Sequence, residues 1–219
     1  MESGMNRGPE RFAPLAGVVF FVLVFVAFAV LGNGSPEPDA ATDTVASFYR
    51  ANAVKQALSA YALILAVPFL VIFVSALRTR LAEIEAPKTW RHLAFAGGLI
   101  AATGFLASAA TVVALTDAAR NHFPPLVMQG MNTLSADSFP IFVAGLGIMS
   151  LGSAGGVLGG AGLPRWLGWL ALAIGIACFI PYVSILGFIA SAIWTVIASV
   201  ALFRANAPDR QTDGASPAN

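Results

Sequence analysis

Charged residues are scarce in this chain. Only 11% of its 219 residues are Asp, Glu, Lys or Arg, whereas 58% are hydrophobic, and the mean hydropathy is +0.79. Soluble domains carry about 25% charged residues, so this composition excludes an ordinary water-surrounded domain. The formal net charge of +1 gives no basic field to attract nucleic acid, and we expect no nucleic-acid partner.

Cysteine and histidine are also rare. The single cysteine, Cys178, lies in an apolar run, which excludes a disulfide framework or a CxxC metal site within the chain. The two histidines, His92 and His122, have no neighbours at a recognisable metal-ligand spacing. No catalytic or cofactor motif is recognisable either. We therefore predict no metal site, no catalytic residues and no cofactor.

What the chain does have is long stretches without charge. Four of them cover 12–36, 56–77, 93–116 and 138–164, and each meets the roughly 20 apolar residues that one helical crossing needs. The fifth, 166–203, would form about 57 Å of helix, nearly twice a hydrocarbon core of about 30 Å. It is therefore predicted to cross twice, with a turn near Pro181 and Tyr182.

These stretches predict an all-α transmembrane bundle that fills residues 1–204. Its six spans are expected near 12–32, 55–77, 93–116, 138–160, 166–182 and 185–203. The first apolar run is longer than that of a usual signal peptide, which favours an uncleaved span, with cleavage after Ala27-Phe28-Ala29 as the alternative. Residues 205–219 are small and polar and are predicted to form a disordered cytoplasmic tail.

Basic residues predict the orientation of this bundle. With both termini in the cytoplasm, nine of them lie inside: Arg7, Arg11, Arg78, Arg80, Lys88, Arg91, Arg165, Arg204 and Arg210. Only three lie outside, namely Arg50, Lys55 and Arg120, as the positive-inside rule expects. The basic residues of 78–91 are interpreted as topological determinants, because Glu83 and Glu85 dilute any polybasic lipid-binding segment.

The span 138–160 is rich in small residues. Its glycines at positions four apart are expected to allow close backbone contact with other helices, most plausibly with 93–116. The glycines concerned are Gly152, Gly155, Gly156, Gly159 and Gly160.

The spans lack ionisable side chains at depth. Their candidate ligand-lining residues are therefore ones that carry a weakly polar group or that would shape a cavity. Pro68 is expected to kink its helix and shape a cavity. Trp194 needs an acceptor for its indole N–H, either on a neighbouring helix as a packed residue, which we favour, or in a polar cavity. Ser153 is a further candidate, although a serine in a helix usually bonds a carbonyl one turn back.

The richest polar cluster is the outer loop 117–137, with Asp117, Arg120, His122 and Asp137. Its amphipathic piece 126–134 is expected to lie flat at the interface. Tyr49, Tyr61 and Tyr182 are expected near the outer interface as part of the aromatic belt. Carboxylates and histidine suit metal binding or acid–base chemistry. The favoured alternative is a solvated loop in which Asp137 complements a helix amino terminus.

Three segments carry a resemblance to a known family. They are Phe48-Tyr49-Arg50-Ala51-Asn52 leading into Ala60-Tyr61, the segment Ser75-Ala76-Leu77-Arg78-Thr79-Arg80-Leu81, and Leu163-Pro164-Arg165-Trp166-Leu167-Gly168-Trp169. In these the chain resembles a family of uncharacterised actinobacterial six-span integral membrane proteins. The resemblance implies a six-helix fold in a bacterial membrane and supplies no active-site residues.

The leading hypothesis is a multi-pass plasma-membrane protein, in contact with membrane lipids, that binds an apolar molecule or a partner membrane protein without catalysing a reaction. Charge-free spans and a closely packing helix motivate it. One alternative is a transporter of a small neutral or lipophilic solute with a cavity near Pro68 and Trp194. The other is a membrane-embedded enzyme with its site at the outer loop.

Overall fold

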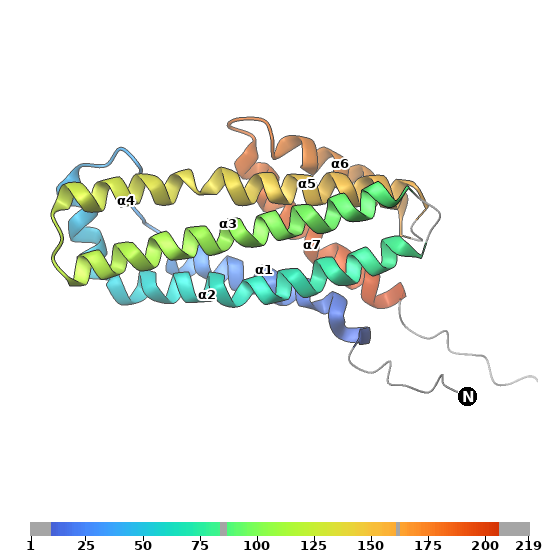
Figure 1. The fold of residues 1–219 in the computed structure, drawn as a ribbon, viewed down its shortest axis with the longest axis horizontal. Coiled ribbons are helices and arrows are strands. Elements are labelled where there is room, and N and C mark those ends of the chain that lie inside the picture. Colours follow the sequence, from blue (N-terminus) through green and yellow to red (C-terminus); the bar gives the residue numbers. More distant parts are fainter. Residues whose placement is uncertain (1–9, 84–86, 161–162, 206–219) are drawn as a thin grey trace, which may run out of the picture.

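The computed structural model describes residues 10–83, 87–160 and 163–205, and Figure 1 shows them as an elongated helical bundle. No strand occurs in these residues, so the predicted all-α class is confirmed. The predicted tail lies outside them from residue 206 onward, as do Arg7 and Arg210. The elements are η1 (Glu10–Leu15), α1 (Ala16–Phe25), η2 (Val26–Leu31), α2 (Thr42–Ala82), α3 (Lys88–Arg120), α4 (Pro125–Asp137), α5 (Phe139–Leu158), α6 (Arg165–Ala177) and α7 (Ser184–Ala205).

Among the described residues, five helical segments are long and apolar enough to cross a membrane. They are Phe12–Leu31, Thr42–Ala82, Lys88–Arg120, Pro125–Leu158 and Ser184–Ala205. The segment predicted to cross at 166–182 instead contains α6, with 13 residues, followed by turns at 178–183. A helix of that length rises only about 20 Å, less than a hydrocarbon core of about 30 Å.

The helices extend well beyond the apolar stretches at one end of the bundle, here called the α4 end. Helix α2 has 41 residues and begins at Thr42 rather than near residue 55. Helix α4 runs in line with α5 (Figure 1), so most of the predicted outer loop 117–137 is helical. The expectation that 126–134 lies flat at the interface is therefore wrong, because this segment packs along the bundle and buries Met128 and Asn132.

The bundle contains two separate hydrophobic cores. The main core takes residues from α1, η2, α2, α3, α5, α6 and α7, and its largest buried side chain is Trp194. The outer core lies at the α4 end, where α2, α3 and α4 meet. It consists of Val45, Ala46, Tyr49, Leu115, Ala118, Ala119 and Met128.

Helices α3 and α5 pack with little side chain between them. A Cβ atom added at Gly152 would collide with the backbone of Ala94, and one added at Gly145 would collide with the backbone of Ala101. Gly97, on the opposing helix, lies against the backbone of α5 in the same way. This reciprocal glycine contact lets the two backbones approach closely and maximises dispersion contact in an apolar solvent.

The other glycines predicted to pack have two different roles. Gly155 lies against the ring of Trp90, and Gly156 lies 2.5 Å from Leu81 measured from an ideal Cβ, so both accommodate bulky neighbours from α3 and α2. Gly159 and Gly160 are exposed and terminate α5. Gly160 has a φ of +109° with no heavy atom close to its Cβ position, so its role is conformational.

The first span ends in a π-helix, η2, and side chains of α2 donate hydrogen bonds to its carbonyls. Here the N–H of Gly32 donates to Ala27 O at 2.7 Å, five residues back. The hydroxyl of Ser59 also donates to Ala27 O, at 2.8 Å, and the amide of Gln56 donates to Leu31 O at 3.3 Å. These side chains from α2 thus satisfy backbone groups that a π-turn leaves available to a neighbour.

The opposite end of the bundle is rich in basic residues and is called the basic end. The end of α2, the start of α3, the start of α6 and the end of α7 all lie toward it (Figure 1). The first span begins there too, since the rings of Phe12 and Phe203 stack with centroids 5.9 Å apart. Its described basic residues are Arg78, Arg80, Lys88, Arg91, Arg165 and Arg204.

Candidate functional sites

The indole of Trp194 is a packed residue with a satisfied donor. Its side chain is 0% exposed, and Nε1 donates to the backbone carbonyl of Leu167 on α6 at 3.0 Å. This bond joins the two helices of the α6–α7 hairpin. The indole donor is therefore committed to holding α6 against α7, and it is not free for a ligand.

Pro68 and Ser153 do not join Trp194 in one site. Pro68 is exposed on α2, whereas Ser153 is buried on α5 and donates to Met149 O at 2.7 Å. The residue inside α2 with non-helical dihedrals is Asn52, with φ −116° and ψ 17°, sixteen residues before Pro68. The side-chain amide of Asn52 donates to Phe48 O at 2.9 Å, so it supplies a hydrogen bond to a carbonyl one turn before this break.

The buried polar side chains of the described residues are all uncharged, being Ser, Thr, Asn and Gln. On α7, three hydroxyls bond carbonyls of their own helix: Ser191 to Phe188 O, Thr195 to Ser191 O and Ser199 to Thr195 O. The hydroxyl of Ser150 on α5 is buried without a partner among the described residues. The α7 hydroxyls thus bond within their own helix, and such groups supply neither a proton carrier nor a nucleophile with a base.

The polar cluster predicted at 117–137 is split by the helix that forms there. Asp117, Arg120 and His122 lie at the α3–α4 corner, whereas Asp137 lies at the far end of α4, about 20 Å away at 1.5 Å per residue. All four side chains are exposed. No group of three His, Cys, Asp or Glu residues able to hold a metal occurs in the part of the chain that the structure describes.

His122 has a structural role at this corner. Its φ is 54°, and its N–H donates to Ala119 O while the N–H of Phe123 donates to Ala118 O at 2.9 Å. This pair of bonds is the Schellman arrangement that closes a helix C-terminus with a left-handed residue. The backbone of His122, rather than its imidazole, therefore accounts for its place in the fold.

A polar network at the α4 end was not foreseen from the sequence. Tyr49 is 2% exposed, and its hydroxyl donates to Asn132 Oδ1 at 3.1 Å. The Asn132 amide in turn donates to the carbonyls of Pro36 and Glu37. Gln129 and Thr133 on the same helix donate to Ala40 O at 3.0 Å and to Pro38 O at 3.2 Å. We call these contacts between α4 and residues 36–40 the α4 clamp.

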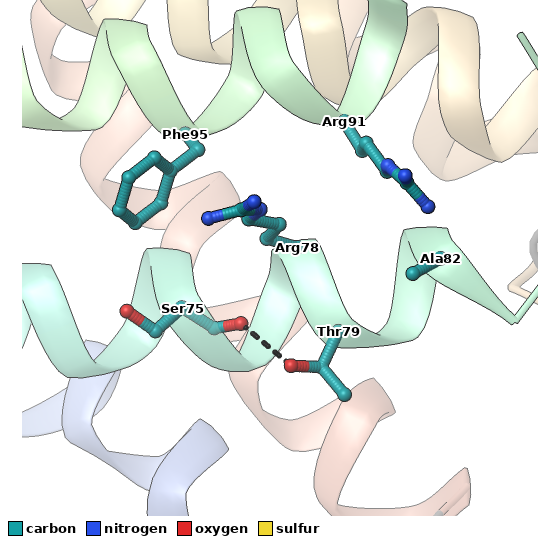
Figure 2. A pocket seen from close by; sticks show the side chains of 6 residues that line it. All are labelled: Ser75, Arg78, Thr79, Ala82, Arg91 and Phe95. Atoms are coloured by element: carbon teal, nitrogen blue, oxygen red, sulfur yellow. Dashed lines mark hydrogen bonds between the residues drawn. The ribbon is translucent and has the colours of Figure 1, made fainter. Parts of the chain in front are cut away.

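The basic end carries an open recess of about 440 Å³ between α2 and α3, here called the basic recess. Figure 2 shows Arg78 and Arg91 reaching into this space from α2 and α3 respectively. The Arg78 guanidinium lies over the ring of Phe95, 4.9 Å from its centroid. The recess is lined by Ser75, Arg78, Thr79, Ala82, Arg91 and Phe95.

The sequence did contain a signal for this recess. A short connection makes α2 and α3 antiparallel, so positions equally distant from it lie side by side, as Val74 and Gly98 do. That register places Arg78 opposite Phe95 and Ala82 opposite Arg91. The sequence analysis treated the same arginines only as topological determinants.

A second recess, of about 390 Å³, lies where η2 meets α2. It is lined by Leu31, Leu58 and residues 50–55. Its arginine, Arg50, already donates to the carbonyl of Phe123 at 3.3 Å. The basic recess therefore has more donor capacity available to a ligand.

Comparison of the chain with protein-family models, with curated proteins and with solved structures finds no match.

Proposed function

We propose that this chain is a multi-pass protein of a bacterial plasma membrane that binds an apolar molecule or a partner membrane protein without catalysis. In this proposal α6 and the turns after it make the fifth of six crossings, and both termini face the cytoplasm. Six basic residues with described side chains at the basic end against three at the α4 end support that orientation: Arg78, Arg80, Lys88, Arg91, Arg165 and Arg204 against Arg50, Lys55 and Arg120.

The observation that carries the binding role is the chemistry of the interior. The main core buries no charged side chain among the described residues, and its buried hydroxyls of Ser59, Ser153, Ser191, Thr195 and Ser199 donate to backbone carbonyls. Proton-coupled transport and catalysis depend on ionisable or convergent polar groups at depth. A sealed apolar bundle instead offers its outer surface, so we expect the ligand or partner to contact the lipid-facing side.

No observation on the described residues supports either alternative function, the transporter or the enzyme. Transport through a cavity near Pro68 and Trp194 is not supported, because Pro68 is exposed and Trp194 is bonded to Leu167. An enzyme site at the outer face is not supported either, because Asp137 lies far from Asp117 and His122 along α4.

The primary test is extraction of the protein in its native lipid with a detergent-free polymer, followed by cryo-EM and mass spectrometry of what is retained. We expect an ordered density, either an apolar molecule or a second membrane protein, against the outside of the bundle. Detergent-exchanged protein, which loses weakly held lipid, is the matched control. Solute flux in proteoliposomes, or turnover of a lipid or peptide by purified protein, would contradict the proposal.

A second test separates binding from chemistry at the outer face. Replacing Asp117 and Asp137 with Asn and His122 with Gly removes the acids, base and metal ligands that the sequence analysis singled out there, while glycine retains the left-handed backbone of residue 122. We expect the variant to retain the same co-isolated molecule in the same amount. His122→Ala is the control for fold, and its free energy of unfolding should be about 1 kcal/mol below that of His122→Gly, since a side chain with a Cβ disfavours positive φ. Loss of a measured turnover in the triple variant alone would identify an enzyme.

A further inference from the structure

We propose that the basic recess binds the phosphate group of an anionic phospholipid, held by the guanidinium groups of Arg78 and Arg91. This names one ligand of the proposed binding function and rests on it. The sequence analysis assigned these arginines only to topology.

Two guanidinium groups from different helices line this recess, one beside Phe95 and the other extending toward Ala82 (Figure 2). Arg78 comes from α2 and Arg91 from α3, and both reach the space between these helices (Figure 2). The Arg78 guanidinium carbon lies 4.9 Å from the centroid of the Phe95 ring, so a cation–π contact holds this guanidinium while its N–H groups remain available. Planar guanidinium groups pair with phosphate oxygens through two parallel bonds, which a lysine ammonium cannot do.

The arginines of the recess have no acidic partner among the described residues. The one ion pair among the described residues joins Arg80 and Glu83, while Glu85 lies outside the described residues. The Nε atom of Arg91 is buried and makes no hydrogen bond. An uncompensated pair of cations with an unsatisfied buried donor is a site that an anion would complete.

The hydroxyls in the recess are already occupied. Ser75 donates to Val71 O at 2.7 Å, and Thr79 donates to Ser75 O at 3.1 Å. Their protons are thus committed to the backbone of α2. The arginines must therefore supply the donors, which favours a charged phosphate over a neutral hydroxyl headgroup.

The surroundings favour a phospholipid over a soluble anion. The recess lies where the uncharged stretches of α2 and α3 end, the depth at which headgroups meet the hydrocarbon core. About one turn further into these stretches, the exposed side chains are apolar, with Ile72 on α2 and Leu99 on α3. A phosphodiester at the arginines would thus have acyl chains running along an apolar helix surface.

The test compares lipid retention by two matched double variants of the full chain. Arg78→Gln/Arg91→Gln removes both guanidinium groups of the recess, whereas Lys88→Gln/Arg165→Gln removes the same charge from exposed positions at the same end. Native mass spectrometry from nanodiscs titrated with phosphatidylglycerol or phosphatidylcholine gives the affinity for each. We expect wild-type protein to prefer phosphatidylglycerol, the recess variant to bind it about tenfold or more weakly, and the control to change by less than about threefold.

Two further arms identify the source of the phosphate and check the fold. Arg78→Lys/Arg91→Lys keeps the charge and should still lose affinity if paired bonds matter, which a general charge effect would not produce. Millimolar inorganic phosphate should leave the phosphatidylglycerol signal unchanged, and displacement by it at equal affinity would overturn a lipid as the ligand. All variants are compared by thermal unfolding. Equal loss of lipid in the Lys88/Arg165 control would overturn the site.

The same experiment separates this inference from the proposed function. A recess variant that loses phosphatidylglycerol selectivity but keeps another co-isolated lipid or protein supports both statements. A recess variant that keeps phosphatidylglycerol at wild-type affinity overturns the recess alone.

Discussion

The two hydrophobic cores of this bundle are built by different means. In the main core, α3 and α5 meet backbone to backbone, with glycines such as Gly97, Gly145 and Gly152 at the contact. In the outer core at the α4 end, larger side chains such as Tyr49, Leu115 and Met128 pack together, and the α4 clamp bonds the adjoining segment 36–40.

Under the proposed membrane placement, this difference follows from the solvent that each core excludes. Apolar side chains gain little by leaving a hydrocarbon environment, so close backbone approach and dispersion must hold the main core together. In water, burial of aromatic and aliphatic surface itself drives packing, and segments without regular structure need partners for their carbonyls. The outer core has both features, as expected of a part that projects beyond the apolar stretches.

The largest effect should come from filling a glycine contact in the main core. Gly152→Ala places a methyl group against the backbone of Ala94, which cannot move aside as a side chain can. We expect a loss of about 3 kcal/mol in the free energy of unfolding, the upper part of the range for overpacking. Steric trapping or reversible denaturation in bicelles would measure it.

Gly130→Ala is the matched control for this change. Gly130 lies on α4 with open space at its Cβ position, so alanine should stabilise the protein by up to about 1 kcal/mol through helix propensity. Equal destabilisation at both positions would show that the α3–α5 contact is not the cause.

A smaller effect, about 2 kcal/mol, is expected from Asn132→Ala in the α4 clamp. Asn132 is 4% exposed and bonds Tyr49, Pro36 and Glu37, so its removal takes the described partners from the buried Tyr49 hydroxyl and the Pro36 carbonyl, while Glu37 O keeps only the N–H of Ala40. The free energy of unfolding should fall, and proteolysis within 32–41 should become faster. Asn121→Ala, whose exposed amide bonds Asp117 O, is the control and should leave this proteolysis unchanged.

The sequence predicted the main core well because its signal is composition. Uncharged stretches and glycines four apart depend on the apolar solvent, and they correctly indicated a helical bundle. They did not indicate where helices end, because the polar ends of α2 and α3 are helical without being apolar. Thr42 and Arg120 therefore lie far beyond the stretches that hydropathy can delimit.

The candidate sites were harder to predict, because a site depends on contacts between distant residues. Asp137 was grouped with Asp117 since both flank one polar segment, but that segment is a helix that separates them. Tyr49 and Asn132 are 83 residues apart in the chain, and no local pattern links them. The basic recess was within reach of sequence reasoning, since antiparallel register alone places Arg78 opposite Phe95.

The smallest effect tests whether polar contacts also matter inside the main core. Ser59 donates to Ala27 O in the π-helix at the end of the first span, and it is one of the few described side chains that hydrogen-bond between helices there. Ser59→Ala should cost only about 0.6 kcal/mol, the mean for such bonds in a membrane protein. Thr103→Val is the control, because the exposed hydroxyl of Thr103 bonds its own helix at Leu99 O and should contribute nothing measurable. If Ser59→Ala instead cost as much as Asn132→Ala, hydrogen bonding would hold the main core as strongly as it holds the α4 clamp. The contrast between backbone contact in the main core and polar contact in the outer core would then have to be abandoned.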